Sequence, residues 1–278
     1  MPELPEAETI VQGLRPTIVG RVVRRTEVVH ADVLRESRSA FAAKVRGGRI
    51  SAVGRRGKNV VVSLDSDRVI AVNLGMTGRL LPFATPPTGA HAPQHPAVRF
   101  RFEGGGVLVF DDTRRFGTVE CLTNAEWEER SERMGPEPLG RGYSAGDLHR
   151  ALGRSRSPVR SWLLDQRRVA GVGNIYANEA LFLAGVHPRT PARAIAADEA
   201  TALHRSLRRV LRAAIRAGGT TLRDYRTAEG LEGQYAPRLF VYGRDDQPCS
   251  RCRSPIRRIV LSNRAAFFCP ECQPEPVA

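Results

Sequence analysis

The sequence contains no long run of apolar residues. No stretch approaches the roughly 18 to 20 consecutive apolar residues that cross a bilayer. The N-terminus also lacks the basic segment followed by an apolar one that marks a secretory signal. We therefore expect a soluble chain that is not exported. No internal repeat is visible along it.

Cysteine is nearly confined to the C-terminal region. Cys121 stands alone, and the other four cysteines fall between residues 249 and 272. A secreted disulfide framework more often distributes an even number of cysteines along the chain. Metal binding in a reducing compartment is therefore the better interpretation.

Acidic residues are also in short supply. The 278 residues include 29 acidic and 43 basic ones, which gives a formal net charge of +14. This imbalance favours a polyanionic partner, most often nucleic acid; an anionic membrane surface and the arginine bias of a GC-rich genome are the alternatives. The length, with 41% hydrophobic residues, is enough for two domains.

The N-terminal half predicts a helix followed by a β-rich domain. Ile10, Val11 and Leu14 have helical spacing, and Gly20 is a stop signal. Residues 22–122 then form short β-rich runs separated by glycine and charge, which favours an antiparallel sandwich or barrel. Proline-rich residues 83–96 predict a surface loop within it.

Residues 134–147 predict an interdomain linker, because the β-rich pattern gives way there to a helical one. Residues 147–166, 174–185 and 197–218 carry apolar residues at helical spacing, and the last segment is basic on its polar side. The second half is therefore expected to be a small helical domain with a cysteine-rich appendage.

The strongest local motif is a pair of C-x2-C knuckles separated by sixteen residues. Their cysteines are Cys249, Cys252, Cys269 and Cys272. A hairpin between the knuckles would bring four thiolates to one zinc ion, and such a closed site is structural rather than catalytic. Arg257, Arg258 and Arg264 on this hairpin are either a solvated face or phosphate contacts.

Four other motifs are weaker when each is taken alone. Asn174 follows a glycine-rich turn, where it is either a helix cap or part of a phosphate site. The sequence DDTRRFG at 111–117 is either a surface loop or a probe of a base stack. Met76, between two glycines, and Lys58, before a strand, could both be structural.

Together these pieces resemble the formamidopyrimidine-DNA glycosylase family. The matching motifs, in order along nearly the whole chain, are PELPEAET, RRGK, NLGMTG, DDTRRFG, GPEPL, LLDQRRVAGVGNIYANEAL, GGTTLRDY, YGRDDQPCSRC and NRAAFFCPEC. The resemblance implies a multidomain α+β fold. Its expected parts are an N-terminal antiparallel β-sandwich with flanking helices at 1–134, a linker at 135–147, a helix-two-turns-helix domain at 148–237 and a β-hairpin zinc finger at 238–278.

The resemblance gives the constrained N-terminus a chemical role. Once Met1 is removed, Pro2 presents a secondary amine, and a terminal amine has an unperturbed pKa of about 7.7 to 8. A position ahead of a helix N-terminus among basic groups favours the unprotonated form further. In the family this amine attacks C1′ of the damaged nucleotide and leaves an iminium. Glu3 matches the general acid/base, and Glu6 matches a supporting carboxylate.

Further positions match the family residue by residue. Lys58 matches the lysine that assists β-elimination, Arg264 the arginine of δ-elimination, and Asn174 the phosphate-binding asparagine. Met76, Arg114 and Phe116 match the residues that fill the space left by a flipped base. The remaining matches are His95 as a DNA contact, Ser155 or Arg156 as a further one, and Thr220, Thr221 and Tyr225 in the lesion-capping loop.

The resemblance therefore implies a bifunctional DNA glycosylase/AP lyase of base-excision repair, which removes 8-oxoguanine and formamidopyrimidines from double-stranded DNA. We expect a monomer with one zinc ion per chain and no membrane partner, in the bacterial cytoplasm or nucleoid. An endonuclease VIII-like enzyme for oxidised pyrimidines is one alternative, but that branch typically opens PEGPE where this chain has PELPE. A noncatalytic zinc DNA-binding protein is another, and it leaves Pro2, Glu3 and Lys58 unexplained.

Overall fold

The computed structural model describes residues 2–89 and 92–276. It divides into two compact units. The sandwich unit comprises Met1–Arg133 and Ile215–Gln234, and the helix–finger unit comprises Met134–Ala214 and Tyr235–Ala278. The boundaries of the four segments expected from the sequence stay predictions.

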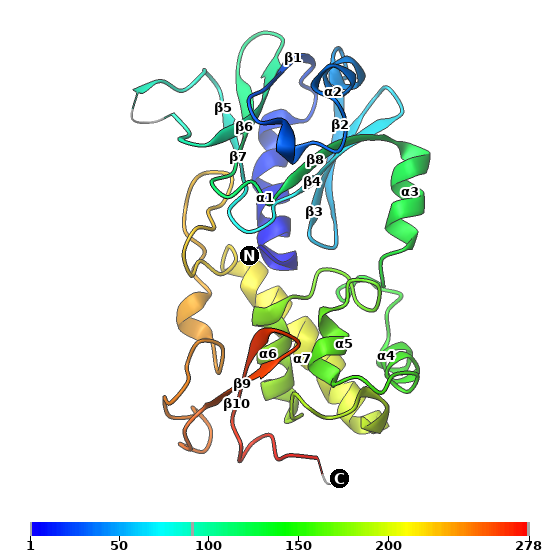
Figure 1. Cartoon of the computed structure of the whole chain (residues 1–278), viewed down its shortest axis with the longest axis vertical. Helices are drawn as coiled ribbons and strands as arrows, with labels where there is room; N and C mark the ends of the chain where they lie inside the picture. The colour runs from blue at the N-terminus through cyan, green and yellow to red at the C-terminus, as the bar shows by residue number, and fades with distance from the viewer. Residues whose placement is uncertain (1, 90–91, 277–278) are drawn as a thin grey trace. The chain divides into compact units, whose positions relative to one another are not determined.

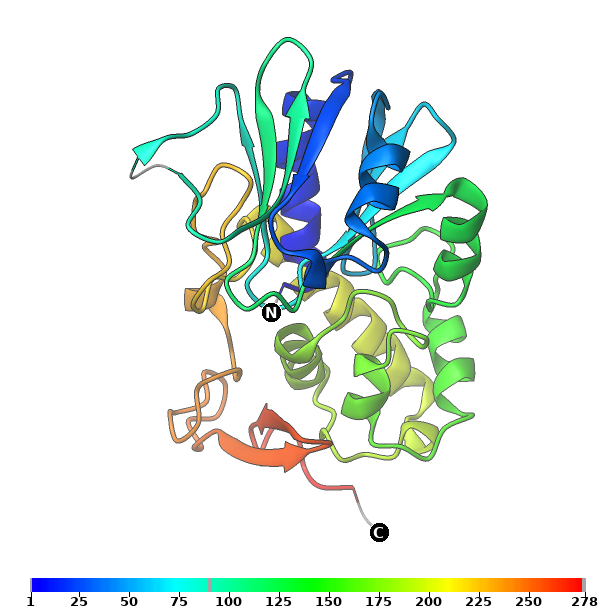
Figure 2. The same ribbon diagram turned by 45° about the horizontal axis from the view of Figure 1, so that its top comes forward.

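The sandwich unit contains two four-stranded antiparallel sheets, with strand orders β1-β6-β7-β5 and β2-β3-β4-β8. Figure 1 labels these strands, and Figure 2 shows them from a tilted view. Their bounds are β1 Val23–Val28, β2 Ile50–Arg56, β3 Asn59–Leu64, β4 Arg68–Asn73, β5 Arg79–Phe83, β6 Pro96–Phe102, β7 Val107–Asp111 and β8 Thr118–Thr123. The predicted antiparallel sandwich is confirmed.

Helices flank this sandwich. Helix α1 (Leu4–Ile18) is the helix expected at the N-terminus, and Gly20 follows it with φ +85°. Helices α2 (Arg38–Val45) and α3 (Asn124–Glu132) were not anticipated. Both are short and begin at a side-chain cap, Ser37 or Thr123, so the cap rather than an apolar period marks them.

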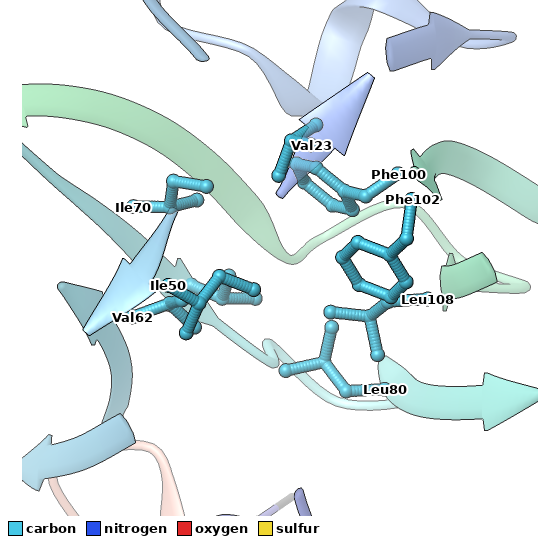
Figure 3. Close-up of a pocket in the computed structure, with 9 residues that line it drawn as sticks. Val23, Ile50, Val62, Ile70, Leu80, Phe100, Phe102 and Leu108 are labelled. Carbon is cyan, nitrogen blue, oxygen red and sulfur yellow. The ribbon is translucent and has the colours of Figure 1, made fainter. Parts of the chain in front are cut away.

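The core of the sandwich unit is one cluster of buried side chains from both sheets and α1. A small internal space of about 10 Å³ lies between the sheets, and Figure 3 shows the side chains that line it. Its lining is Val23, Ile50, Val62, Ile70, Val72, Leu80, Phe100, Phe102 and Leu108. This volume barely admits one water molecule and the lining offers it no polar partner, so the space is a packing defect rather than a ligand site.

The helix–finger unit contains most of the helical part of the chain. Its elements are α4 Ala145–Leu152, α5 Val159–Leu164, α6 Asn174–Ala184, α7 Ala197–Arg216 up to Ala214, β9 Arg257–Leu261 and β10 Arg264–Phe268. The helical segment expected at 147–166 is split in two, and Pro158 stands at the N-cap of the second helix. Among the described residues, no helix is both long and apolar enough to cross a bilayer.

Candidate active site

The N-terminal residues are buried and tied to the start of α1. Pro2 is buried, and Glu3 and Glu6 are only 2% and 1% exposed. Glu3 is the N-cap of α1 and forms a capping box with Glu6, whose Oε2 accepts a hydrogen bond from Glu3 N at 2.8 Å. Met1, which the chemistry expected from the resemblance requires to be removed, lies outside the described residues.

The other oxygen of Glu6 reaches the lesion-loop residues expected from the sequence. Thr220 N donates a hydrogen bond to Glu6 Oε1 at 2.8 Å. Tyr225 is buried in the same core, and its hydroxyl donates to Gly218 O at 3.1 Å. Thr221 Oγ1 donates to Tyr225 O at 3.0 Å. Burial raises the pKa of Tyr225, which keeps the phenol protonated as a donor.

Lys58 lies in the turn between β2 and β3, and its side chain is half-buried. Two contacts show the direction of β2 along α1: Arg15 Nε donates to Val53 O at 2.8 Å, and Arg55 Nε donates to Glu8 Oε2 at 3.1 Å. As β2 advances, its partners on α1 move toward the helix N-terminus. The turn that carries Lys58 therefore lies at the Pro2 end of α1.

Met76, Arg114 and Phe116 form an exposed group at two adjoining loops. Met76 is 37% exposed and Phe116 is 58% exposed, and the Arg114 guanidinium stacks 4.7 Å from the centre of the Phe116 ring. Gly75 (φ +59°) packs against the other loop so closely that a Cβ there would lie 2.5 Å from Gly117 N. The structure thus brings these three predicted residues together.

A buried carboxylate organises these two loops. Asp112, 1% exposed, accepts hydrogen bonds from the Thr77 hydroxyl and from Gly117 N, and Thr77 Oγ1 accepts one from Arg114 N at 3.0 Å. His95 lies beside this network, because its backbone carbonyl accepts a hydrogen bond from Asp112 N at 2.9 Å. The residue is exposed. We had not singled out Asp112 and Thr77. Two aspartates directly after the apolar run GVLVF were the available signal.

In the helix–finger unit, Asn174 is joined to the β9–β10 hairpin that carries Arg264. Asn174 Nδ2 donates to Ala265 O at 3.1 Å. The buried Arg160 donates to Asn174 Oδ1, to Ala265 O at 2.6 Å and to Leu261 O at 3.1 Å. The turn residues before Arg264 both have positive φ, as a two-residue hairpin requires. These contacts bring two of the predicted residues into one neighbourhood.

Arg160 was also missed in the sequence, although an arginine among the apolar residues of α5 was a signal. Burial lowers the pKa of Arg160 to about 10, and the nearby positive charge of Arg264 contributes to that lowering. A buried arginine that donates to two hairpin carbonyls and to Asn174 fixes the position of that asparagine. Arg160 therefore contributes to the candidate site by fixing Asn174 against the β9–β10 hairpin.

The structure separates the two candidates for the basic contact near residue 155. Ser155 is half-buried, and its hydroxyl is engaged with that of Ser157 at 2.9 Å. Arg156 is exposed. Arg156 is therefore the better candidate.

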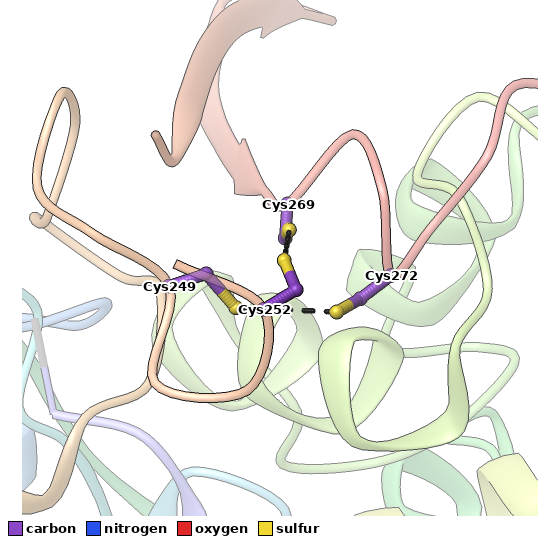
Figure 4. Close-up of side chains that lie close together, drawn as sticks. All are labelled: Cys249, Cys252, Cys269 and Cys272. Atoms are coloured by element: carbon purple, nitrogen blue, oxygen red, sulfur yellow. Dashed lines mark hydrogen bonds between the residues drawn. The ribbon is translucent and has the colours of Figure 1, made fainter. Parts of the chain in front are cut away.

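Four cysteines of the finger converge on one point, as Figure 4 shows. The sulfur atoms of Cys249 and Cys272 lie 4.0 Å apart, those of Cys252 and Cys269 lie 3.3 Å apart, and all four lie within 4.8 Å of one another. Zinc–sulfur bonds of about 2.3 Å in a tetrahedron place sulfurs about 3.8 Å apart. The four thiolates fit one structural zinc ion, as predicted.

Comparison with protein families gives three matches along the chain. Residues 1–119 match the formamidopyrimidine-DNA glycosylase N-terminal domain, residues 134–226 match the H2TH domain of that glycosylase, and residues 246–274 match a zinc finger found in FPG and IleRS.

Individual proteins are similar over almost their whole length. The formamidopyrimidine-DNA glycosylase of Chloroflexus aggregans is 42% identical over 274 residues, which cover 98% of each chain. The crystal structure of the MutM (Fpg) protein from Thermus thermophilus matches with a TM-score of 0.88 and 39% identity, covering 99% of this chain and 100% of the other. A complex of Lactococcus lactis Fpg with DNA containing an abasic site matches with a TM-score of 0.90 and 30% identity, covering 98% and 100%.

Proposed function

The chain belongs to the formamidopyrimidine-DNA glycosylase family and is a DNA glycosylase of base-excision repair, and we propose that it attacks the damaged nucleotide with the nitrogen of Pro2. We propose oxidised purines, 8-oxoguanine and formamidopyrimidines, as its substrates in double-stranded DNA. One Lactococcus lactis neighbour was solved with Fapy-dG-containing DNA, which supports this substrate class.

The observation that carries the proposal is the position of Glu6. Its buried carboxylate accepts one hydrogen bond from Glu3 N, next to Pro2, and one from Thr220 N in the expected lesion loop. One side chain therefore ties the nucleophile's neighbour to the segment that would hold the damaged base. Pro2 is buried, and surroundings poor in water favour the uncharged, nucleophilic form of an amine in general.

In the first chemical stage, the bond from C1′ to the base is exchanged for a bond from C1′ to the Pro2 nitrogen. The Pro2 nitrogen donates its electron pair to C1′, the bond from C1′ to the base breaks, and the base leaves with those electrons and takes up the proton that the Pro2 nitrogen gives up. Glu3 then protonates the ring oxygen as the C1′–O4′ bond opens, which leaves an iminium between Pro2 and the sugar.

The second stage cuts the strand. Loss of a C2′ proton from the iminium expels the 3′ phosphate by β-elimination, and loss of a C4′ proton expels the 5′ phosphate by δ-elimination. We assign assistance in the first elimination to Lys58 and in the second to Arg264. Water then hydrolyses the remaining iminium and restores the Pro2 amine.

Other residues would hold the DNA. Met76, Arg114 and Phe116 are exposed together, as a wedge that fills the place of a flipped nucleotide must be, with Arg114 facing the orphaned base. Phosphate contacts are assigned to the remaining predicted residues, His95, Asn174 and Arg156. We further propose that the protein acts as a monomer in the bacterial cytoplasm or nucleoid.

Borohydride trapping tests the mechanism, because reduction of the iminium leaves a permanent protein–DNA crosslink. Two proteins should be compared on an 8-oxoguanine duplex: the mature form with a free Pro2, and a form with one extra residue joined to Pro2. We expect the first to crosslink and nick, with mass mapping to Pro2, and the second to do neither. Equal crosslinking by both forms contradicts the proposal.

A lesion panel decides the substrate class in the same assay. Duplexes with 8-oxoguanine, a formamidopyrimidine, an oxidised pyrimidine and no lesion should be compared at equal concentration. The proposal expects trapping to be fastest on the two purine lesions. Faster trapping on the oxidised pyrimidine would instead favour an endonuclease VIII-like specificity.

A further inference from the structure

Helix α7 carries a row of arginines that the proposed reaction does not use. Arg205, Arg209 and Arg212 are all exposed and follow one another at spacings of four and three residues. We call these three residues the α7 arginine stripe. Within the part of the chain that the structure describes, none of them has a hydrogen bond or an ion pair. Their neighbour Arg208 differs, because it donates to Pro138 O at 2.8 Å and to Gly140 O at 3.0 Å.

The stripe points away from the body of its unit. Leu203, Leu207, Val210 and Ala214 are buried to 1% exposure or less and define the inner face of α7. At 3.6 residues per turn, the stripe lies roughly 160° around the helix from this face. Its guanidiniums therefore project into solvent.

The stripe opposes the stability of the helix that carries it. Residues three or four positions apart on a helix are neighbours, and like charges at these spacings repel. The positive charge of Arg212 also contributes, after burial, to lowering the pKa of Arg208. The repulsion between these arginines lowers the stability of the folded state, whereas a bound polyanion would relieve it.

The chemistry of the stripe favours a phosphate backbone as that polyanion. Successive arginines are about 6.0 and 4.5 Å apart along the helix axis by a rise of about 1.5 Å per residue, and each presents a planar fork suited to phosphate. Beside the arginines of the stripe, the outward face carries Asp198, Thr201, Ala202, Ala213 and Arg216. It lacks the large apolar residues with which a helix inserts into a membrane or anchors a protein partner.

We propose that the α7 arginine stripe binds the backbone of a second, undamaged DNA duplex while the active site holds the lesion duplex. Contacts of this kind are independent of sequence and dominated by released counterions. A glycosylase that holds a second segment can move between DNA segments without first dissociating. The stripe is then an accessory nucleic-acid surface whose three arginines have no role in the proposed reaction.

The experiment uses the full-length protein loaded with an unlabelled duplex that contains a tetrahydrofuran abasic analogue. A fluorescent undamaged duplex is then titrated by anisotropy, against wild type and against R205Q/R209Q/R212Q. The variant should bind the second duplex more weakly on the order of a hundredfold at about 0.1 M salt, with a salt slope smaller by about 2.7. A lysine triple variant should restore most of the affinity.

Matched controls separate charge, folding and the primary site. R24Q/R35Q/R46Q removes three exposed arginines of the sandwich unit and should leave second-duplex affinity within about twofold, since those residues lie outside the stripe. The stripe variant should melt at or above the wild-type temperature, because glutamine is also a good helix former and the repulsion is gone. It should bind the abasic-analogue duplex as wild type does.

Three results would overturn the proposal. One is equal second-duplex affinity in wild type and the stripe variant. Another is an equal loss of both duplexes, which would make the stripe part of the primary site. The third is stripe-dependent binding of phosphatidylglycerol vesicles or polyglutamate without binding of a second duplex. None of these readouts depends on the Pro2 chemistry, so this proposal and the proposed mechanism fail separately.

Discussion

Glu6 accepts a hydrogen bond from the backbone amide of Thr220, 214 positions further along the chain, at 2.8 Å. Both groups are buried, and the other oxygen of Glu6 is occupied by the amide of Glu3. The carboxylate therefore serves two donors at once. A change at Glu6 should therefore alter the position of Thr220, and a change in the loop of Thr220 should alter the position of Glu6.

Glu6→Gln should lose both stability and activity. Glutamine keeps the shape but has one accepting oxygen, so one buried amide, Glu3 N or Thr220 N, loses its partner at a cost of about 1 to 3 kcal/mol. We expect that loss in urea unfolding, together with slower borohydride trapping on 8-oxoguanine DNA. Glu129→Gln, which breaks an exposed ion pair with Arg133 on α3, is the control and should cost about 1 kcal/mol or less. Wild-type trapping by Glu6→Gln would show that the link has no role in the reaction.

Gly219→Ala should disturb the predicted lesion loop more than Gly230→Ala does. Both glycines have positive φ, +88° and +80°, so both substitutions strain the backbone by about 1 kcal/mol. Only at Gly219 would the new Cβ also approach side chains, at 2.9 Å from Tyr225 and 3.1 Å from Glu6. Excision rates and melting temperatures of the two variants isolate this contact. Equal effects of the two substitutions would leave backbone strain as the only cause.

Phe116→Ala should impair function while leaving stability almost unchanged. The ring is 58% exposed, so its removal should alter the unfolding free energy by only about 0.5 kcal/mol. The wedge would lose its aromatic part, and single-turnover excision of 8-oxoguanine should slow. Val29→Ala removes another exposed apolar side chain, 38% exposed, and should leave excision at the wild-type rate. If Phe116→Ala also excises at that rate, the assignment of the wedge is wrong.

Cys249→Ser should remove zinc, loosen the finger and weaken binding to damaged duplexes. One of four thiolates is lost, and metal binding contributes directly to the folding of such a site. Zinc content by mass spectrometry should fall from one ion per chain, with a lower melting temperature. Cys121→Ser, in the sandwich core and outside the cluster, should keep its zinc. A full zinc content in Cys249→Ser would rule out the four-cysteine site.

The sandwich unit should lose stability in acid as Glu27 becomes protonated. A hydrogen bond from Arg101, together with the positive charges of Arg101, Arg25 and Arg99, holds the pKa of Glu27 below its usual 4.5 despite the opposing effect of burial. The folded state therefore binds fewer protons than the unfolded state. This contribution to stability is present above about pH 4.5 and is lost as the pH falls through the folded pKa.

The test is the unfolding free energy of wild type and Glu27→Gln as a function of pH. The difference between the two should be largest near neutrality and shrink toward zero in acid. Glu103→Gln, an exposed carboxylate just after β6, should show a much smaller difference. A constant difference for Glu27→Gln from about pH 7 to about pH 3 would contradict the assigned cause.

Local patterns were enough for much of the fold. Helices α6 and α7 were predicted from their apolar period, and the alternation of Arg99 and Arg101 with buried neighbours in β6 was as expected. Helix α7 and strand β6 bury one face of a regular structure, so the sequence itself shows the period, whereas α6 buries every residue from Ile175 to Phe182. Helix α3 buries none of its residues, and no such period existed to reveal it.

Contiguous motifs and the spacing of four cysteines are enough to identify the family, the nature of the metal site and the residue types available for chemistry. Which of these groups work together depends on the three-dimensional packing. Asp112 under the wedge loops, Arg160 beneath Asn174 and the hydrogen bond from Thr220 to Glu6 are such cases. These links join backbone amides, carbonyls and single side chains far apart in the chain, and nearly every residue offers a backbone amide. Which amide meets which carboxylate is fixed only when the core packs.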